Sequence, residues 1–299
     1  MTRHVEVIAV EGPVSIQDLG RTGRRADTLP SSGAADQAAH RLANRIVGNL
    51  EDAATLECAY ATIRLRCVSD QLVALCGAER RVEVWGTSRP MDRGGTGLAF
   101  AVHAGEELVI GHPTSGLRSY LAVRGGIDAT PTLGSRSWDS LSRLGPRPPT
   151  PGDLLPVGDL VDPSAVPLRD HSTAPLRSRD EIPLDPGPHL DLLDPPARRA
   201  LGSVTMTVGA RADRIGLQLD EILTTGLPAD LPSFPVLPGS LQIPPDGRPL
   251  LLGRDCGVTG GYPVVGVVPL DALDLVGQLR PGDRFRFRLG PKARSTGRR

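Results

Sequence analysis

The stretch Arg284-Phe285-Arg286-Phe287-Arg288-Leu289 alternates basic and apolar side chains. Successive side chains of a β-strand point to opposite faces, so this pattern predicts a strand with one buried face and one polar face. Strands of this kind are typical of antiparallel sheets. The same period of two recurs around Val5, Val82 and Met206. Short apolar runs bounded by Gly or Pro predict further strands at 71–77, 108–111, 120–123 and 250–253.

Two segments follow the helical period instead. In residues 35–47, apolar side chains recur three and four positions apart, with Ser32 as the expected N-cap and Gly48 as the expected stop. In residues 270–279, apolar side chains share one face between a proline that begins the helix and a Pro-Gly pair that follows it. With so little helix, the sequence predicts a mainly β protein.

A Pro-rich stretch with weak patterning separates two strand-rich regions. We assign residues 1–145 to an N-terminal β domain and residues 201–299 to a C-terminal β domain. Residues 146–200 are expected to be a connecting segment with partial order.

The charge balance disfavours several classes of partner. The 299 residues carry 34 basic and 34 acidic side chains, so the formal net charge is zero. This gives no electrostatic basis for binding nucleic acid or an anionic membrane. The apolar runs are too short to cross a bilayer, and no long apolar region follows Met1, so we expect no signal peptide. The sequence therefore favours a cytoplasmic protein.

Chemistry based on lysine or on a metal is also disfavoured. Lys292 is the only lysine, and it lies in a C-terminal tail that reads as disordered. The rest of the chain offers no lysine for a Schiff base or a P-loop. The four cysteines form no C-x-x-C pair and the six histidines are scattered, so we expect no metal site.

A series of short motifs gives the chain a family resemblance. One reads Ser15-Ile16-Gln17-Asp18-Leu19-Gly20-Arg21-Thr22-Gly23, and another reads Thr259-Gly260-Gly261-Tyr262-Pro263. The others lie at residues 32–36, 43–49, 118–127, 133–137, 239–244 and 278–283. They extend over nearly the whole chain and resemble the family of the C subunit of 5-oxoprolinase. That family is also described as allophanate hydrolase subunit 2 or as biotin-dependent carboxyltransferase-like.

The resemblance implies a fold and an activity. The fold would be two tandem cyclophilin-like β-barrel domains with few helices. The activity would be the ATP-dependent opening of 5-oxoproline to glutamate, together with an A and a B subunit as partners. ATP would be bound by the complex, either on another subunit or between subunits, and we identify no biotin site in this chain. We expect the isolated chain to be catalytically silent.

The chain departs from the family pattern at three places. Residues 255–263 read D-C-G-V-T-G-G-Y-P, without the family's glutamine and one of its threonines. Residues 212–216 read A-D-R-I-G in place of S-N-R-M-G, and residues 233–235 read S-F-P where S-E-G is common. These differences bear on the substrate and the catalytic role, and leave the fold expectation unchanged.

The first candidate site follows an expected strand. Asp18 beside Arg21 would orient the guanidinium, whose planar donors suit a carboxylate or a phosphoryl group; alternatively, the pair holds a turn. We take both as candidate catalytic residues. Asp36 is either a site residue or a helix N-terminal carboxylate, and Glu57 is either a site carboxylate or a buried partner of an arginine. Candidate substrate- or phosphate-binding residues here are Gln17, Asp36, Asn44 and Glu57.

The second candidate site lies around paired glycines. Gly260 and Gly261 allow close backbone approach, so their amides would face an anion; alternatively, they form a tight turn. Asp255 is a candidate catalytic residue, expected to converge on a cleft with neighbours in the same motif. Arg214 either binds phosphate or makes a surface ion pair. Candidate binding residues here are Arg214, Thr259, Gly260, Gly261 and Tyr262.

Three functions stay open at this point. The first is the C subunit of a 5-oxoprolinase. The second is a carboxyltransferase or amidohydrolase component that acts on urea or allophanate. The third is a regulatory binding protein, because some members of the family are described as antagonists of kinase inhibitors in sporulation control. The face of Arg284, Arg286 and Arg288 is a solvated or partner-facing strand surface, and we expect it to form part of a partner-contact rim.

Overall fold

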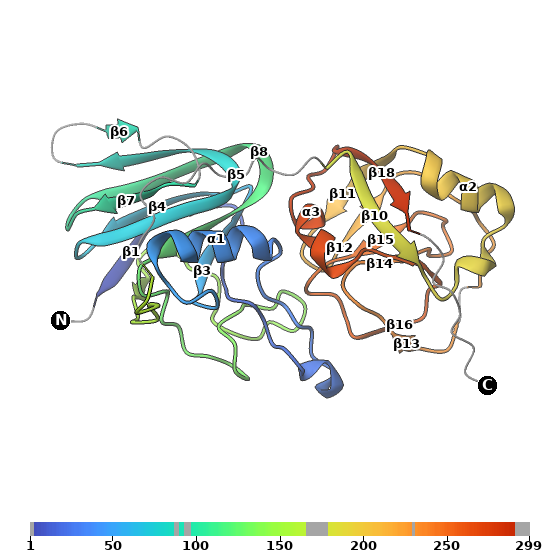
Figure 1. The fold of residues 1–299 in the computed structure, drawn as a ribbon, viewed down its shortest axis with the longest axis horizontal. Helices are drawn as coiled ribbons and strands as arrows, with labels where there is room; N and C mark the ends of the chain where they lie inside the picture. The colour runs from blue at the N-terminus through green and yellow to red at the C-terminus, as the bar shows by residue number, and fades with distance from the viewer. Residues whose placement is uncertain (1–2, 87–89, 93–96, 166–178, 229–230, 291–299) are drawn as a thin grey trace. The chain divides into compact units, whose positions relative to one another are not determined.

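The computed structural model is mainly β, with three short α-helices among the residues it describes (Figure 1). Described are residues 3–86, 90–92, 97–165, 179–228 and 231–290, so the predicted tail around Lys292 lies outside them. Residue contacts divide the chain into two compact units. The first holds Met1–Gly23 and Ser31–Arg177, and the second holds Arg24–Pro30 and Ser178–Arg299. The predicted β class is confirmed.

The first unit is built on an antiparallel sheet of nine strands. Its order is β2-β3-β8-β4-β1-β9, and β5 pairs with β8 and with β6 and β7. The strands are β1 His4–Glu11, β2 Val14–Gln17, β3 Thr55–Ala59, β4 Thr62–Cys67, β5 Gln71–Trp85, β6 Pro90–Asp92, β7 Ala99–Val102, β8 Glu107–Val123 and β9 Leu154–Pro156. Alternate side chains such as Val7, Leu65 and Leu121 fill one core, as the period of two predicts.

The long strand β8 differs from the sequence expectation. The predicted strands 108–111 and 120–123 are two ends of this one strand, which pairs with β5 along most of its length. Register irregularities between Gly77 and Val82 allow the pairing to continue past Pro113, which interrupts the apolar pattern. Gly77 has φ +100°, and a Cβ there would lie 2.5 Å from the carbonyl oxygen of Arg118. A side chain at residue 77 would therefore block this close approach.

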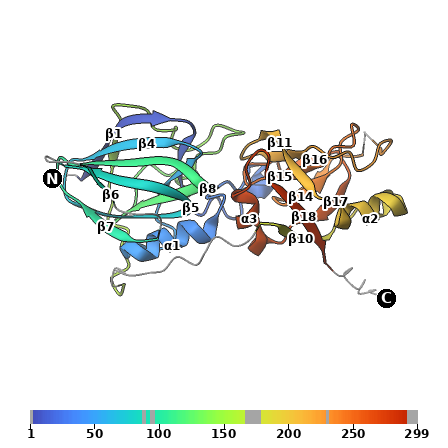
Figure 2. The ribbon, with the colours of Figure 1, turned by 90° about the horizontal axis from the view of Figure 1, so that it is seen from above.

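Helix α1, Gln37–Val47, covers one face of the first unit's sheet and is the longest of the described helices. Figure 2 shows it lying against β5 and β8. Its buried face includes Ala39, Ile46 and Val47, in agreement with the predicted spacing, whereas Ala38 of the predicted face is exposed. The N-cap prediction was wrong by four residues, because Asp36 rather than Ser32 accepts the Ala39 N–H, at 2.9 Å. Gly48 ends the helix as predicted, with φ 73°.

Removing this cap should weaken the first unit by a measurable amount. Asp36→Ala leaves an N–H of the first turn without its acceptor, so we expect the free energy of unfolding to fall by about 1 kcal/mol. Asp36→Asn keeps a capping oxygen and should lose much less. Urea unfolding of both variants checks this, and equal losses would show that the cap contributes nothing.

The second unit contains a closed barrel of seven strands, ordered β10-β17-β14-β15-β12-β11-β18. The barrel strands are β10 Glu181–Pro186, β11 Met206–Ala212, β12 Gly216–Leu219, β14 Ser240–Gln242, β15 Leu250–Leu252, β17 Val264–Val267 and β18 Arg284–Leu289. A separate pair joins β13, Phe234–Pro235, to β16, Thr259–Gly260. β10 and β18 pair in parallel, and the other described barrel pairs are antiparallel.

Strand β18 has the boundaries and the two faces that its sequence predicts. Phe285 and Phe287 are buried in the barrel core and meet edge to face, with ring centroids 5.1 Å apart. The three arginines of the strand are exposed. On the surface of the second unit, the face formed by these arginines is therefore available to solvent or to a partner.

The helical elements of the second unit are short. The predicted helix 270–279 is a 3₁₀ turn, η3 Leu270–Ala272, followed by the short helix α3, Leu273–Gly277. Two further 3₁₀ turns are η1 Arg24–Asp27 and η2 Leu190–Leu192, and helix α2 spans Pro195–Ser203. Strands β9 and β10 and helix α2 lie wholly or partly within residues 146–200, the range assigned to a connection. In the described part of the chain, the helices lack the length and apolar character needed to span a bilayer.

Candidate functional site

Two loop segments of the first unit run side by side at the end of β2. The N–H of Arg21 donates to Ser31 O at 2.7 Å, and the N–H of Ala34 donates to Asp18 O at 2.8 Å. Gly20 and Gly33 face each other where the segments meet. A Cβ on Gly20 would lie 2.4 Å from Ser31 O, and both glycines have positive φ. Glycine at these positions thus allows the segments to approach closely enough to bury the polar side chains between them.

The carboxylate of Asp18 holds these segments to a third loop. It accepts hydrogen bonds from the Gly20 N–H at 2.8 Å, from Ser135 Oγ at 2.7 Å, and from the Arg136 N–H and Ser137 Oγ. Ser137 Oγ also accepts from the N–H of Asp18 itself, at 3.1 Å. Four protein donors therefore occupy the two carboxylate oxygens. This arrangement suits a positioning residue better than a group that exchanges protons with a substrate.

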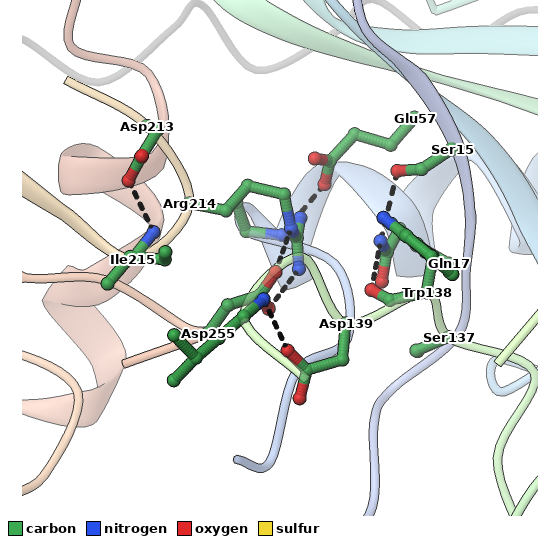
Figure 3. A network of polar contacts seen from close by, with 12 residues as sticks. Ser15, Gln17, Glu57, Ser137, Trp138, Asp139, Asp213, Arg214, Ile215 and Asp255 are labelled. Carbon is green, nitrogen blue, oxygen red and sulfur yellow. Dashed lines mark hydrogen bonds and ion pairs between the residues drawn. The ribbon is translucent and has the colours of Figure 1, made fainter. Parts of the chain in front are cut away.

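Arg21 and Gln17 reach the same loop from β2. Arg21 Nη2 donates to Ser137 O at 2.6 Å. Gln17 Nε2 donates to Trp138 O at 2.9 Å and to Ser15 Oγ at 3.0 Å (Figure 3). The expected Asp18–Arg21 ion pair is not among the contacts of the described residues, and both side chains bind Ser137 instead. Arg21 Nε and Nη1 and Gln17 Oε1 are buried without a hydrogen-bond partner in the described structure.

Glu57 is the centre of a second buried cluster in this unit. It accepts from the Ala35 N–H at 3.0 Å and from the Tyr120 hydroxyl at 2.8 Å, and its Oε1 lies 3.4 Å from Arg118 Nε. The N–H of Asp36 in turn donates to Tyr120 Oη at 2.8 Å. Of the two interpretations of Glu57, the structure supports the buried partner of an arginine.

The environment of Tyr120 keeps its hydroxyl protonated. Desolvation by burial raises the pKa of Tyr120 well above its ordinary value, and the negative charges of Glu57 and Asp36 add to this effect. The hydroxyl therefore remains a donor to Glu57 across the physiological pH range.

Asn44 belongs to a third polar group, which fastens α1 to the loop that precedes β3. Its Nδ2 donates to Ala53 O at 2.7 Å, and its Oδ1 accepts from Asn49 Nδ2 at 2.9 Å. His40, one turn earlier, contacts Thr55 Oγ1 through Nδ1 at 2.9 Å and Glu51 O through Nε2 at 3.1 Å. These contacts give Asn44 a structural role.

His40 should make the stability of the first unit depend on pH. Burial lowers the pKa of His40 to about 4, although the charge of Asp18 opposes this shift. In the unfolded chain the pKa of a histidine is about 6.5, so the unfolded state binds the extra proton between these values. The contribution is present above about pH 6.5 and is lost as the pH falls toward 4.

We expect a fall from pH 7 to pH 4.5 to cost on the order of 2–3 kcal/mol through His40. Urea unfolding at both pH values, for wild type and His40→Gln, isolates this contribution. The loss of stability should be smaller in the variant by about that amount, and equal losses in the two proteins would contradict the assignment.

In the second unit, Arg214 and Asp255 form a forked ion pair. Arg214 Nε lies 2.8 Å from Asp255 Oδ2, and Nη2 lies 2.9 Å from Oδ1 (Figure 3). The Arg214 side chain is 11% exposed and that of Asp255 is fully buried, so the pair is buried rather than on the surface. The turns that carry them also meet, because the Asp255 N–H donates to Arg214 O at 3.0 Å.

The paired glycines lie at a strand end near the surface. Gly260 pairs with Phe234, and a Cβ there would lie 2.6 Å from Gln242 Nε2, so close approach does occur at this residue. Neither glycine is among the described residues with positive φ. Thr259 is exposed and Tyr262 is 39% exposed, whereas Asp255 is fully buried. These side chains therefore differ in exposure, and their convergence on one cleft stays a prediction.

Four polar residues near the first candidate site were missed as site residues in the sequence, although all four lie in quoted motifs. Arg118 and Tyr120 belong to residues 118–127, and Ser135 and Ser137 belong to residues 133–137. Their place in two motifs of the resemblance was the signal that would have found them. Within the portion of the chain that is described, no three His, Cys, Asp or Glu side chains lie close enough to hold a metal ion.

The two units together define the class of protein. The closed barrel and the half-barrel sheet match a two-barrel, cyclophilin-like fold, as the sequence predicted. The crystal structure of TTHA0988 superposes with a TM-score of 0.84 and 34% identity, covering 96% of this chain and 56% of that one. K. lactis urea amidolyase superposes with a TM-score of 0.80 and 27% identity, covering 96% of this chain and 19% of that one.

Within this class, the chain belongs to the carboxyltransferase domain family, subdomain A and B, whose model matches residues 28–289. The C subunit of 5-oxoprolinase from Escherichia coli (strain K12) is 33% identical over 263 residues, covering 85% of this chain and 81% of the relative. The family resemblance that the motifs indicated is thereby confirmed.

Proposed function

We propose that this chain is the C subunit of an ATP-dependent 5-oxoprolinase that acts with an A and a B subunit. The observation that carries the proposal is the similarity to the E. coli 5-oxoprolinase chain, which extends over most of both proteins. Urea amidolyase also matches this chain, but the chain corresponds to a small part of that enzyme, 19% of its length. A separate subunit of a hydrolase therefore fits the similarity better than a multifunctional enzyme.

The chemistry of the proposed reaction explains why partners are needed. The lactam carbonyl of 5-oxoproline is a poor electrophile, and transfer of a phosphoryl group to its oxygen makes attack by water far easier. Such a step needs cations for the phosphoryl oxygens and a base for water. In the described residues, Asp18 and Asp255 are each engaged by protein donors, so they serve as positioning residues in this scheme. We assign nucleotide binding, and the base that activates water, to the complex as a whole.

Arg21 is the residue of this chain best placed to meet the substrate. Its guanidinium keeps Nε and Nη1 without a described partner, whereas Arg214 is held by Asp255. Asp36, Asn44 and Glu57 have structural contacts that position α1 and the strands beside it. Because the reaction consumes ATP, we place the complex in the cytoplasm.

A second candidate function is carboxyl transfer to a urea-like amide. The family model and the match to urea amidolyase favour it. The two functions differ in their products, because carboxyl transfer consumes bicarbonate through a biotin carrier and 5-oxoprolinase releases glutamate. Transfer of the label from labelled bicarbonate into the product of the reconstituted system would favour this second function.

The partnership itself is testable through the exposed arginines of β18. A stable interface commonly buries roughly 1,200–2,000 Å² in total, with arginine enriched in it. We expect the chain to co-elute with the A and B subunits on gel filtration at micromolar concentrations. Arg284→Glu should weaken this association about tenfold or more, whereas Arg199→Glu, an exposed arginine on α2, should leave it unchanged. Separate elution of the wild-type chain would contradict the proposed partnership.

A further inference from the structure

The first unit contains a buried cation whose charge nothing in its described surroundings neutralises. Arg21 is 2% exposed and makes one side-chain hydrogen bond, from Nη2 to the carbonyl oxygen of Ser137. Nε and Nη1 have no partner among the described residues, and none of the described carboxylates forms an ion pair with it. Burying a guanidinium in this way is unfavourable unless an anion completes its contacts.

The other buried arginines of this unit, Arg80 and Arg118, have more of their contacts filled, although the Nε of each also lacks a hydrogen bond in the described structure. Arg80 reaches the carbonyl oxygens of Cys58, Ala61, Gly111 and Leu117. Arg118 lies against the carboxylate of Glu57. Among the described residues, Arg21 contacts a single carbonyl oxygen through its side chain and no carboxylate. A structural role therefore accounts for Arg80 and Arg118, but it leaves most of the hydrogen-bonding capacity of Arg21 unused.

Two neighbouring side chains also carry unused polar atoms. Gln17 Oε1 and Ser32 Oγ are buried and lack hydrogen-bond partners in the described structure. Gln17 and Arg21 donate to the carbonyls of Trp138 and Ser137, so both side chains reach the same two-residue stretch of the third loop. Ser32 follows Ser31, whose carbonyl accepts from the Arg21 N–H, and it is held at φ +52°. Backbone strain of this kind often accompanies a functional site.

The unused atoms specify the chemistry of a ligand. The guanidinium and the hydroxyl supply donors and a positive charge, which suit a carboxylate. The amide oxygen of Gln17 is an acceptor, which suits an N–H group of the same ligand. A small acid with a carboxylate and an amide N–H offers both.

We propose that Gln17, Arg21 and Ser32 form a subsite of this chain for a lactam acid or a closely similar amide-bearing carboxylate. The proposal rests on the proposed function, in which 5-oxoproline is such a molecule. The carboxylate binds Arg21 and Ser32, and the lactam N–H donates to Gln17 Oε1. Because these atoms are closed to solvent, the ligand enters when the segments that meet at Gly20 and Gly33 separate. Asp18 positions the loop but does not touch the ligand.

Binding to the purified full-length chain tests this subsite without partners or ATP. The probes are 5-oxoproline, 2-pyrrolidinone, which lacks the carboxylate, and 5-oxotetrahydrofuran-2-carboxylate, which keeps the ring carbonyl but has a ring oxygen in place of the lactam N–H. Calorimetry should detect 5-oxoproline binding most tightly, the second acid about tenfold or more weakly, and 2-pyrrolidinone not at all. Arg21→Met should weaken 5-oxoproline binding at least about 30-fold, and Gln17→Leu should abolish the preference between the two acids.

Thermal unfolding separates ligand recognition from folding. Without ligand, Arg21→Met should melt at the same temperature as wild type or higher, because a buried cation without a counter-charge is removed. The matched control is Arg80→Met, which removes the hydrogen bonds from this guanidinium to four carbonyls. It should melt several degrees lower, yet still respond to 5-oxoproline.

Three outcomes would overturn the subsite. These are the absence of acid binding by wild type up to about 10 mM, equal binding by Arg21→Met, and a loss of partner affinity in Arg21→Met without any acid binding. The last result would assign the anion to a partner's carboxylate. If instead the chain binds the acids through Arg21 and the full complex releases no glutamate, the subsite stands and the proposed function is wrong.

Discussion

Arg214→Met is expected to lower the free energy of unfolding by about 3–5 kcal/mol, because it leaves the fully buried carboxylate of Asp255 without its cation. Removing one partner of a buried pair is more harmful than losing the pair, since the remaining charge stays desolvated. A backbone hydrogen bond also joins the turn of Arg214 to the turn of Asp255, so the substitution should destabilise both turns. Urea unfolding followed by circular dichroism measures it.

Two further variants make this prediction specific. Arg214→Met combined with Asp255→Leu removes both charges and should recover much of the lost stability. Arg211→Met alters an exposed arginine near the end of β11 and should change stability little. If Arg214→Met is as stable as Arg211→Met, the ion pair does not support the barrel as we describe.

Asp18→Asn is expected to cost about 3 kcal/mol and to loosen the loop at residues 135–137. The carboxylate accepts four hydrogen bonds. An amide in its place puts an NH₂ group, which cannot accept a hydrogen bond, opposite some of these donors. Urea unfolding gives the loss, and hydrogen exchange gives its location. The N–H groups of Gly20 and Arg136 should exchange much faster in the variant.

The matched control for this second prediction is Asp128→Asn, which changes a half-exposed carboxylate in an ion pair with Arg136. It should leave both the stability and the exchange rates nearly unchanged. Protection of Gly20 and Arg136 that persists in Asp18→Asn would mean that Asp18 does not organise this loop.

Much of the fold could be predicted because local pattern and burial agree. Strand β18 has the predicted boundaries, since Phe285 and Phe287 face the core and the arginines between them face outward. Helix α1 buries Ala39, Ile46 and Val47 of the predicted face and has the predicted glycine stop. In both elements the burial of one face decides the structure, and the spacing of the apolar residues indicates which face is buried.

Features that depend on distant contacts could not be predicted in this way. Strand β8 reads as two short strands because Pro113 and Gly116 interrupt its pattern, and only pairing with β5 makes it continuous. Ser32 was preferred over Asp36 as the N-cap because both suit that position, and the path of the loop decides between them.

The site residues were recognisable, but their partners were not. Asp18 binds a loop that begins 117 residues further along the chain, and Arg214 meets Asp255 across 41 residues. The motifs therefore identified polar side chains with special roles. The structure was needed to assign Asp18 as a positioning residue and Arg21 as a buried cation with unfilled hydrogen bonds. The roles of these residues in catalysis stay predictions.

The most direct test of the proposed function is the release of glutamate from 5-oxoproline by purified components. The chain is assayed alone, with each candidate partner, and with the A and B subunits together, in each case with and without ATP. We predict glutamate release when all three subunits and ATP are present, and none from the isolated chain. Robust turnover by the chain alone, or no glutamate from the complete ATP-supplied mixture, would contradict the account.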